Sequence, residues 1–240
     1  MIVLSIIQAR VDSERFPGKV LMKIQGKSIL EHIINFLKFS KLTDLIVIAT
    51  TTLPEDDQIE ELSKFLGIKC FRGSTYDVLG RYYECAKIFN GDFIVRLTSD
   101  NPFVDPFVVD EAIRLCQEKK CDYVSNLIPQ TFPLGYSACE VLTFHSLKKL
   151  YENQIDPLSR EHVTYHIRQN PTLYKIMNVC APPNLARPNW RLTIDYEEDL
   201  KLIRKIFSAL YTPNSLIQYQ SLVNFLDNNK ELLKINNKHH

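Results

Sequence analysis

The chain opens with short apolar runs that are separated by segments of helical spacing. Ile2 to Ile7 is an apolar run interrupted only by Ser5, as expected of a strand buried on both faces. Leu45 to Ala49 and Phe93 to Leu97 repeat this pattern. Two shorter runs, at Lys69 to Phe71 and at Tyr123 to Val124, predict two further strands.

The segments between these runs predict helices with recognisable ends. Ser28 with Glu31 three residues later forms a capping box at the start of one helix. Gly67 is expected to end the next helix. Asp105 followed by Pro106 supplies a cap and a first helical residue for another. The apolar stripes lie at 29–37, 59–66, 78–89, 109–116 and 200–210.

This alternation predicts an α/β fold with a mostly parallel sheet that is covered by helices on both faces. Open sheets of this kind bind their ligands beyond the carboxyl ends of the strands. The loops after Ile7, Ala49, Phe71 and Leu97 are therefore expected to carry the chemistry.

The alternation fails from about 128 to 188, where seven prolines interrupt the chain. We predict an insertion here, with a strand near Glu140 to Leu142 and two short helices. Strand character returns at Leu192 to Ile194, and a last helix is expected within Ser221 to Leu233. A second independent domain would leave two small parts, so we expect a single domain over 1–240.

Composition excludes several classes of function. The chain has 45% apolar and 24% charged residues, which is typical of a folded globular protein. Its 29 basic and 28 acidic residues give a net charge of +1, so we expect neither nucleic acid nor a membrane as partner. The apolar start is too short to span a bilayer and lacks the basic region of a signal peptide.

The six cysteines have no zinc-binding spacing, and we predict reduced, buried thiols and a cytoplasmic protein. His239 and His240 are set aside, because a terminal histidine pair is typical of a purification tag.

A basic loop follows the first predicted strand. Arg10, Arg15 and Lys19 lie within ten residues, and Gly18 after Pro17 allows a tight turn. Guanidinium and ammonium groups suit a triphosphate. An ordinary solvated surface loop could have the same composition. The loop is not a Walker loop, because the GxxxxGK pattern is absent.

Two aspartates follow predicted strands and are candidates for a metal site. Asp100 comes after the fourth strand, and Asp195 comes after Leu192 to Ile194. Their carboxylates could hold Mg²⁺ beside a polyphosphate. Equally, Asp100 could begin a turn and Asp195 could cap the following helix.

Arg72 and Gly73 follow the third predicted strand, and Asp77 and Arg81 lie in the next helix. Gly73 would let a flat base approach the backbone, and Arg72 or Arg81 could donate to cytosine. Alternatively, Arg81 pairs with Asp77 at a spacing of four residues.

Five ordered stretches resemble the CMP-Kdo synthetase-like cytidylyltransferases, with most similarity to the spore coat polysaccharide biosynthesis protein F branch. These stretches are Gln8 through Lys19, Asp77 through Tyr82, Arg96 through Pro102, Arg160 through Thr164, and Arg191 through Leu200. The resemblance implies a Rossmann-like, GT-A three-layer sandwich, CTP as donor, Mg²⁺, and an insertion that builds a homodimer and the acceptor site.

The resemblance also implies roles for individual residues. Arg10, Arg15 and Lys19 are expected to hold the triphosphate, with Gln8, Ala9 and Ser13 beside the nucleotide, and Asp100 and Asp195 to bind the metal. The cytidine pocket is expected to be completed by Arg72, Gly73, Asp77 and Arg81.

The acceptor side departs from the family. The branch often carries Gly-Leu-Asp-Val-Glu, whereas this chain keeps Glu140 and has Ala138 in place of the acidic residue. This difference indicates an altered acceptor. The other acceptor-side candidates are Arg160, Glu161 and His162, and for His162 an orienting contact fits as well as a substrate contact.

Together with these residues, the resemblance implies an in-line transfer of CMP from CTP to a small sugar-like acceptor, with release of pyrophosphate. Such an acceptor could be a sugar acid, a polyol phosphate or a phosphonate, in the synthesis of a surface polysaccharide or glycoconjugate precursor. Two alternatives are a GT-A-type glycosyltransferase that uses a nucleotide sugar and a nucleotide-sensing protein without catalysis. The three cations of the basic loop suit a triphosphate, which favours the transferase that uses CTP.

Overall fold

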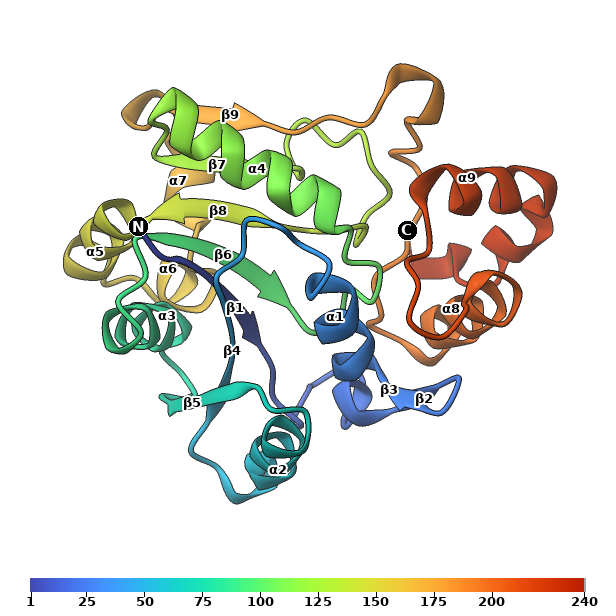
Figure 1. Cartoon of the computed structure of the whole chain (residues 1–240), viewed down its shortest axis with the longest axis horizontal. Helices are drawn as coiled ribbons and strands as arrows, with labels where there is room; N and C mark the ends of the chain where they lie inside the picture. Colours follow the sequence, from blue (N-terminus) through green and yellow to red (C-terminus); the bar gives the residue numbers. More distant parts are fainter. Residues whose placement is uncertain (240) are drawn as a thin grey trace.

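A seven-stranded mixed sheet forms the centre of the molecule in the computed structural model, which describes residues 1–239 (Figure 1). His240 lies outside the described residues. The strands, in spatial order, are β5 (Lys69–Gly73), β4 (Leu45–Thr51), β1 (Val3–Gln8), β6 (Phe93–Thr98), β8 (Glu140–Thr143), β7 (Tyr123–Ser125) and β9 (Ile176–Asn178). A separate small hairpin pairs β2 (Lys23–Ile24) with β3 (Lys27–Ser28).

Helices cover both faces of this sheet. One apolar core lies between the sheet and α1 (Ile29–Leu37), α2 (Asp57–Phe65) and α4 (Pro106–Lys119), and it continues into α8 (Glu197–Leu210) and α9 (Tyr219–Asn228) beside α1. A second core lies between the other face and α3 (Val78–Ile88), α5 (Phe144–Asn153), α6 (Pro157–Glu161) and α7 (Tyr165–Gln169). Successive strand residues alternate between the two cores, as Val3 and Leu4 do, because side chains in a strand point to opposite faces.

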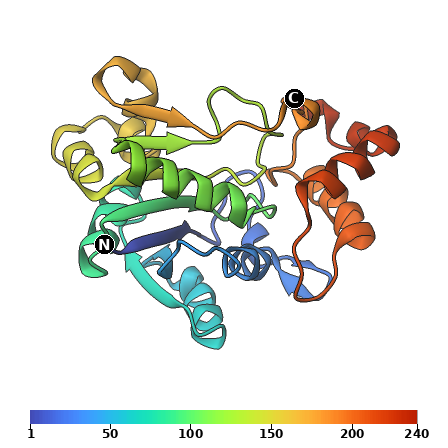
Figure 2. The same ribbon diagram turned by 45° about the horizontal axis from the view of Figure 1, so that its top comes forward.

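The C-terminal helices α8 and α9 lie together at the end of the molecule that also holds α1 and the β2–β3 hairpin (Figure 1, Figure 2). The Arg204 guanidinium links the two parts, because its Nη2 donates to the Lys23 carbonyl at 3.1 Å. Both views show α4 lying over the sheet in the middle of the molecule, where it packs against β7 and β8.

The sheet is parallel on one side and mixed on the other. β5, β4, β1 and β6 are all parallel to their neighbours. β8 then pairs antiparallel with both β6 and β7, and β9 pairs parallel with β7. The region 128–188 thus supplies two strands of the central sheet, β8 and β9, together with α5 to α7.

The sequence predictions of the fold are largely confirmed. The α/β class and the mostly parallel sheet are as expected, and the Ser28–Glu31 capping box begins α1. Asp105 caps α4 by accepting from the Phe107 N–H at 2.9 Å. Gly67 follows α2 with φ +67°, a conformation that glycine adopts at little cost.

Three predictions of local structure are wrong in whole or in part. Leu192 to Ile194 is extended but lies outside the sheet, because the Leu192 and Ile194 N–H groups donate to Leu134 and Asp100 carbonyls instead of a strand. The 128–188 region has three helices, α5, α6 and α7, where two were expected. Of the six thiols, four are buried, but Cys70 is half-buried and Cys180 is exposed.

Among residues 1–239, no helix has both the length and the apolar character that crossing a bilayer requires.

Candidate active site

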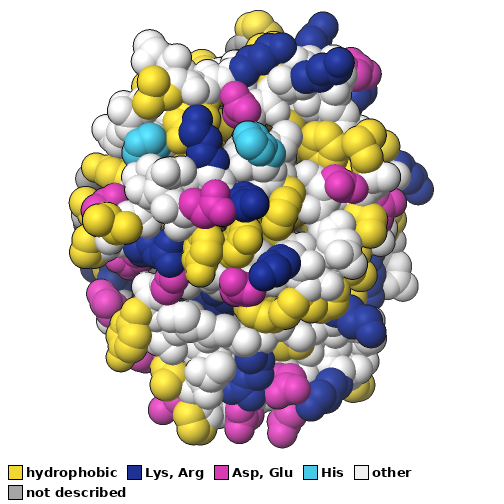
Figure 3. Space-filling model, turned by 90° about the vertical axis from the view of Figure 1, so that its left-hand side faces the viewer, with side chains coloured by type: hydrophobic (Ala, Val, Ile, Leu, Met, Phe, Trp, Pro, Cys, Tyr) yellow, Lys and Arg dark blue, Asp and Glu magenta, His cyan; other side chains and the backbone are white. Residues whose placement is uncertain are grey.

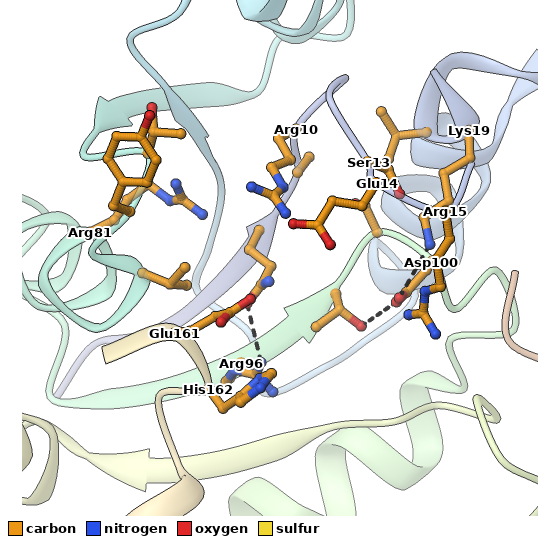
Figure 4. A pocket seen from close by; sticks show the side chains of 18 residues that line it. Arg10, Ser13, Glu14, Arg15, Lys19, Arg81, Arg96, Asp100, Glu161 and His162 are labelled. Atoms are coloured by element: carbon orange, nitrogen blue, oxygen red, sulfur yellow. Dashed lines mark hydrogen bonds and ion pairs between the residues drawn. The ribbon is translucent and has the colours of Figure 1, made fainter. Parts of the chain in front are cut away.

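A cleft of about 390 Å³ opens at the carboxyl ends of β1 and β6 (Figure 4). Its walls are the loop after β1, the loop after β6, the start of α3 and the end of α6. A volume of this size lies in the range of small-molecule sites. Figure 4 shows Arg15, Lys19 and Asp100 at one end, Arg81, Arg96, Glu161 and His162 toward the other, and Arg10 and Glu14 between them.

The basic loop after β1 closes on itself. The Val11 carbonyl accepts from the Gly18 N–H at 2.8 Å and from the Ser13 N–H at 3.0 Å. Gly18 has φ +74°, which glycine alone adopts at little cost. The closed loop turns Arg10, Ser13 and Arg15 toward the cleft, and Lys19 follows it in a short helical turn, η1 (Lys19–Leu21).

Lys19 joins the two predicted metal ligands. Its Nζ lies 3.2 Å from Asp195 Oδ1 and 3.6 Å from Asp100 Oδ2, and it donates to the Ile194 carbonyl at 2.6 Å. The lysine comes from the η1 turn after the basic loop, Asp100 from the loop after β6, and Asp195 from the segment before α8. Three distant parts of the chain therefore meet at one ammonium group.

Asp195 is surrounded by cations. Arg15 Nη2 donates to its Oδ1 at 2.7 Å, and Arg191 Nη2 donates to its Oδ2 at 2.7 Å. Burial alone would raise the pKa of this carboxyl, but Lys19, Arg191 and Arg15 outweigh it and lower the pKa. Asp195 is therefore held as a carboxylate.

The buried Asp199 supports this carboxylate from behind. It accepts from the Asp195 and Tyr196 N–H groups at 2.9 and 3.0 Å and pairs with Arg191 at 3.1 Å. The N-cap position of α8 is Tyr196, so the alternative cap role of Asp195 is not the one seen.

Asp100 is the more open of the two carboxylates, with 29% of its side chain exposed. Its Oδ1 accepts from the Thr98 hydroxyl at 2.6 Å, and Thr98 in turn accepts from the Asn101 amide at 2.6 Å. These two bonds fix the turn after β6 and leave Asp100 Oδ2 facing Lys19 and the cleft.

The far end of the cleft contains Arg96, Glu161 and His162. The Arg96 guanidinium pairs with Glu140 behind it and donates to Gln8 Oε1 at 3.2 Å. Burial works against the charge of Arg96, but the Glu140 carboxylate outweighs it and raises the Arg96 pKa.

Glu140 itself does not reach the cleft. Only 1% of its side chain is exposed, and it accepts from Arg96, from the Tyr123 hydroxyl at 2.5 Å and from the Thr164 hydroxyl at 2.5 Å. A direct contact between Glu140 and an acceptor is therefore not what the structure shows. Its charge balances Arg96, which does line the cleft.

Three residues predicted at the cytidine pocket have other partners. Arg72 donates to the Thr51 and Leu53 carbonyls at 2.9 and 2.7 Å, on the outside of the cleft wall. A Cβ at Gly73 would lie 2.8 Å from the Phe71 ring, so this glycine makes room for a side chain. Asp77 caps α3 through the Gly80 N–H at 2.8 Å.

Arg160, predicted on the acceptor side, pairs with Asp77. Arg81 does line the cleft, but its Nη1 donates to the Ser74 carbonyl at 2.7 Å, in place of the proposed Asp77 pair. Burial lowers the pKa of Arg81. Of the predicted residues, the cleft thus brings together Gln8, Ala9, Arg10, Ser13, Arg15, Lys19, Arg81, Asp100, Glu161 and His162.

Several residues of the cleft were not predicted individually. They are Glu14, Val20, Thr75, Tyr76, Val78, Arg96, Thr98 and Ser99. A usable signal existed for Arg96, because a charged residue inside an otherwise apolar strand requires a partner. Tyr76 and Thr75 sit in a loop whose course depends on tertiary contacts, and the sequence gives no sign of it.

The chain is similar to known proteins in sequence and in fold. The family model described as cytidylyltransferase matches residues 4–234. The spore coat polysaccharide biosynthesis protein SpsF of Bacillus subtilis is 35% identical over 210 residues, which cover 85% of this chain and 86% of SpsF.

Two solved structures share the fold. A cytidylyltransferase from Leptospira borgpetersenii has a TM-score of 0.90 and 32% identity, with 97% of each chain covered. CMP:2-keto-3-deoxy-manno-octonic acid synthetase, solved with CTP, has a TM-score of 0.67 and 15% identity, with 87% of this chain and 99% of that chain covered. The second likeness shows the fold alone.

The expected resemblance is therefore confirmed. With a family model spanning nearly its whole length, the chain belongs to the cytidylyltransferases, which are CTP-dependent nucleotidyltransferases, in the branch near SpsF.

Proposed function

We propose that this enzyme transfers CMP from CTP to a small sugar-like acceptor and releases pyrophosphate. The observation that carries the proposal is the convergence of Asp100 and the buried Asp195 on Lys19, which lines one end of the cleft together with Asp100. The acceptor is a sugar acid, a polyol phosphate or a phosphonate. The product serves as a precursor of a surface polysaccharide or glycoconjugate, and the reaction takes place in the cytoplasm.

Arg10, Arg15 and Lys19 bind the triphosphate in this proposal. All three line the cleft, and Arg15 is 56% exposed, so its guanidinium is free to turn from Asp195 toward a phosphate. Cations that hold the β- and γ-phosphates also stabilise the charge on the departing pyrophosphate. Gln8, Ala9, Ser13 and Arg81 form the wall beside the nucleoside.

The donor set fits Mg²⁺ when the nucleotide supplies part of it. Within residues 1–239, no group of three or more His, Cys, Asp or Glu side chains could hold a metal ion by itself. Two carboxylates do converge on the Lys19 ammonium group, and Mg²⁺ in nucleotide sites is commonly held by one or two carboxylates plus phosphate oxygens. Asp100 and Asp195 would hold it, and it would neutralise charge on the phosphates.

Arg96, Glu161 and His162 are placed to contact the acceptor. They lie in the same cleft as the triphosphate residues, at the end away from Lys19 (Figure 4). An acceptor oxygen between the two ends can approach the α-phosphorus in line with the departing pyrophosphate.

Pyrophosphate release tests the proposal directly. Purified enzyme with Mg²⁺ is incubated with CTP, UTP, ATP or GTP and with a panel that contains a 2-keto sugar acid, a polyol phosphate and a phosphonate. We expect release with CTP in the presence of one acceptor class. Release with a different nucleotide, or CTP binding without turnover for every acceptor, would contradict the proposal.

The glycosyltransferase alternative receives no support from the comparisons, because the matching family is that of the cytidylyltransferases. A triphosphate also accounts better for three loop cations than the diphosphate of a nucleotide sugar does.

We further propose a homodimer. The face that carries α3, α5 and α6 mixes hydrophobic and charged side chains (Figure 3), and Ile155 and Leu158 are exposed there. Light scattering behind size exclusion should give a mass close to twice 27.9 kDa. A monomeric mass at every concentration would reject the dimer.

A further inference from the structure

Asp56 carries a buried carboxylate that none of the roles above explains. It is the last residue of the 3-10 turn η2 (Pro54–Asp56), and only 1% of it is exposed. A carboxylate withdrawn from water costs free energy unless hydrogen bonds replace its hydration. The groups that supply those bonds therefore indicate what this side chain does.

The partners of Asp56 belong to two different loops. Its Oδ1 accepts from the Val11 N–H at 2.7 Å. Its Oδ2 accepts from the Thr51 N–H at 3.3 Å and from the Thr51 hydroxyl. One side chain thus ties the end of β4 to the basic loop that follows β1.

Val11 is the point at which the basic loop closes. Its carbonyl accepts from both Ser13 and Gly18, so its N–H and its carbonyl are each occupied by a loop-forming bond. Arg10 directly precedes Val11, and Lys19 directly follows Gly18. A shift of Val11 would move all the cations that face the triphosphate end of the cleft.

Arg72 holds the Asp56 segment from the outside. It donates to the Thr51 carbonyl at 2.9 Å and the Leu53 carbonyl at 2.7 Å, and it pairs with Asp57 at 2.5 Å. These bonds fix the chain on both sides of Asp56. The guanidinium that was expected on the cytosine therefore stabilises the support of the basic loop.

We propose that Asp56 is a positioning residue for the triphosphate. It does not line the cleft, and it acts by holding Val11 so that Arg10, Arg15 and Lys19 converge on the phosphates. The inference rests on the proposed function only in taking the ligand to be a triphosphate. It predicts that Asp56 matters for the phosphates and not for the nucleoside.

The test compares three probes by titration calorimetry in the presence of Mg²⁺: CTP, inorganic tripolyphosphate and CMP. Asp56→Ala should raise the Kd of CTP and of tripolyphosphate about tenfold and leave that of CMP within about twofold. Asp56→Asn keeps one oxygen that can accept from Val11, so it should restore part of the lost affinity.

Asp110→Ala is a matched control. The Asp110 carboxylate also binds backbone N–H groups of a loop, but at the opposite end of the sheet. It accepts from the Lys41 and Leu42 N–H groups at 2.9 and 3.2 Å, just before β4. This variant should lose stability but keep all three affinities. If Asp56→Ala fails to fold, Thr51→Val removes one bond to Asp56 and should show the same selective loss, in smaller degree.

Each outcome is decisive. Equal weakening of CMP, CTP and tripolyphosphate, or unchanged binding of tripolyphosphate, would overturn the positioning role. Wild-type enzyme that binds tripolyphosphate but not CTP would reject the proposed function while the role of Asp56 could still be measured. Wild-type enzyme that binds neither would overturn both.

Discussion

At the scale of single residues, the triphosphate end of the cleft consists of charges that neutralise one another. Asp195 accepts from Arg15, Lys19 and Arg191, so both of its oxygens are occupied. Arg191 is also held by Asp199, whereas Arg15 is exposed. In the proposed function, a triphosphate would compete for Arg15 and Lys19 and would leave Asp195 with Arg191 as its fixed partner.

Asp100→Asn should lower the rate of pyrophosphate release about a thousandfold, because a neutral amide is a poor ligand for Mg²⁺. The fold should persist, since the Asn oxygen can still accept from the Thr98 hydroxyl. Steady-state pyrophosphate assays and thermal unfolding measure the two effects.

Asp12→Asn serves as the control for Asp100→Asn. Asp12 is an exposed carboxylate of the basic loop and does not line the cleft, so this change should leave turnover nearly unchanged. Turnover of Asp100→Asn within about tenfold of the wild type would remove Asp100 from the chemistry.

Glu140→Ala should lower the free energy of unfolding by about 3–5 kcal/mol, because it leaves the Arg96 charge, which is only 13% exposed, without its partner. Glu140→Gln should cost less, since its amide oxygen can still accept from Thr164 or Tyr123. Urea denaturation at pH 7 compares both with wild type. A loss near zero for Glu140→Ala would mean that Arg96 reaches water when unpaired.

The same residue predicts a pH dependence. Burial would raise the Glu140 pKa, but Arg96 and the Thr164 and Tyr123 hydroxyls outweigh it, so the pKa lies below the ordinary value of 4.5. The unfolded chain then binds a proton before the folded one does. The stabilisation is complete above pH 4.5 and is lost as the pH falls toward the folded pKa.

Urea denaturation below pH 4.5 checks this sign. The difference in stability between wild type and Glu140→Gln should shrink as the solution becomes more acidic. A difference that grows instead would show that Glu140 is protonated in the folded protein.

At the scale of elements, the site depends on three segments that pack without a gap. Gly135 lies against the Asn101 turn and the Thr193 backbone, with φ +87°. The Thr193 segment runs on to Asp195, and the Asn101 turn carries Asp100. Local contacts of one glycine thus set the spacing of the two carboxylates.

Gly135→Ala should therefore destabilise the protein by about 1–3 kcal/mol and reduce pyrophosphate release. Its Cβ would lie 2.5 Å from the Thr193 nitrogen, so the segment that carries Asp195 must shift. Urea denaturation and the pyrophosphate assay measure the two losses.

Gly26→Ala is the control that separates backbone strain from displacement of a neighbouring segment. Gly26 has φ +81° but nothing within 4 Å of a Cβ, so its change strains the backbone without moving a neighbour. Turnover should then fall only for Gly135→Ala. Equal turnover in the two variants would mean that the packing around Gly135 does not position the carboxylates.

The elements that the sequence predicts well are those whose signals are local. The apolar run of β1 and the capping box of α1 each depend on a few neighbouring residues. By contrast, Leu192 to Ile194 is apolar and extended, yet it binds the Leu134 and Asp100 carbonyls instead of a sheet strand. β9 has only three residues, all half-buried. Its pairing with β7 depends on tertiary contacts, and its own sequence has no pattern that predicts it.

The difference between local signals and tertiary contacts also explains which site residues could be predicted. Arg10, Arg15 and Lys19 are close together in the sequence, so their shared position at the cleft could be predicted from it. Arg72 was misplaced because an arginine at a strand end points to whichever carbonyls and carboxylates surround it, here those of the Thr51 to Glu60 region. Asp56 was missed because its partner Val11 is 45 residues away.

At the scale of the whole molecule, charge is concentrated locally although the total is small. The net charge is +1, yet the cations Arg10, Arg15, Lys19, Arg81 and Arg96 line one cleft and outnumber its carboxylates, Glu14, Asp100 and Glu161. Attraction of a nucleotide therefore comes from this cleft and not from the general surface. Such local attraction is strongest at low ionic strength.

Binding of Mg²⁺ and CTP should be strongly coupled in this arrangement. Mg²⁺ alone must compete with Lys19, Arg15 and Arg191 for the two carboxylates, and no third acidic or histidine ligand is available among residues 1–239. CTP offers Arg15 and Lys19 new partners and adds phosphate oxygens. We therefore expect little thermal stabilisation by Mg²⁺ alone and a large one by both together, about 2.7 kcal/mol when the nucleotide is at 100 times its Kd. Asp100→Asn should abolish the part of the thermal stabilisation that requires Mg²⁺. If Mg²⁺ alone stabilised the wild type as much as Mg²⁺ with CTP, the metal site would form without the nucleotide.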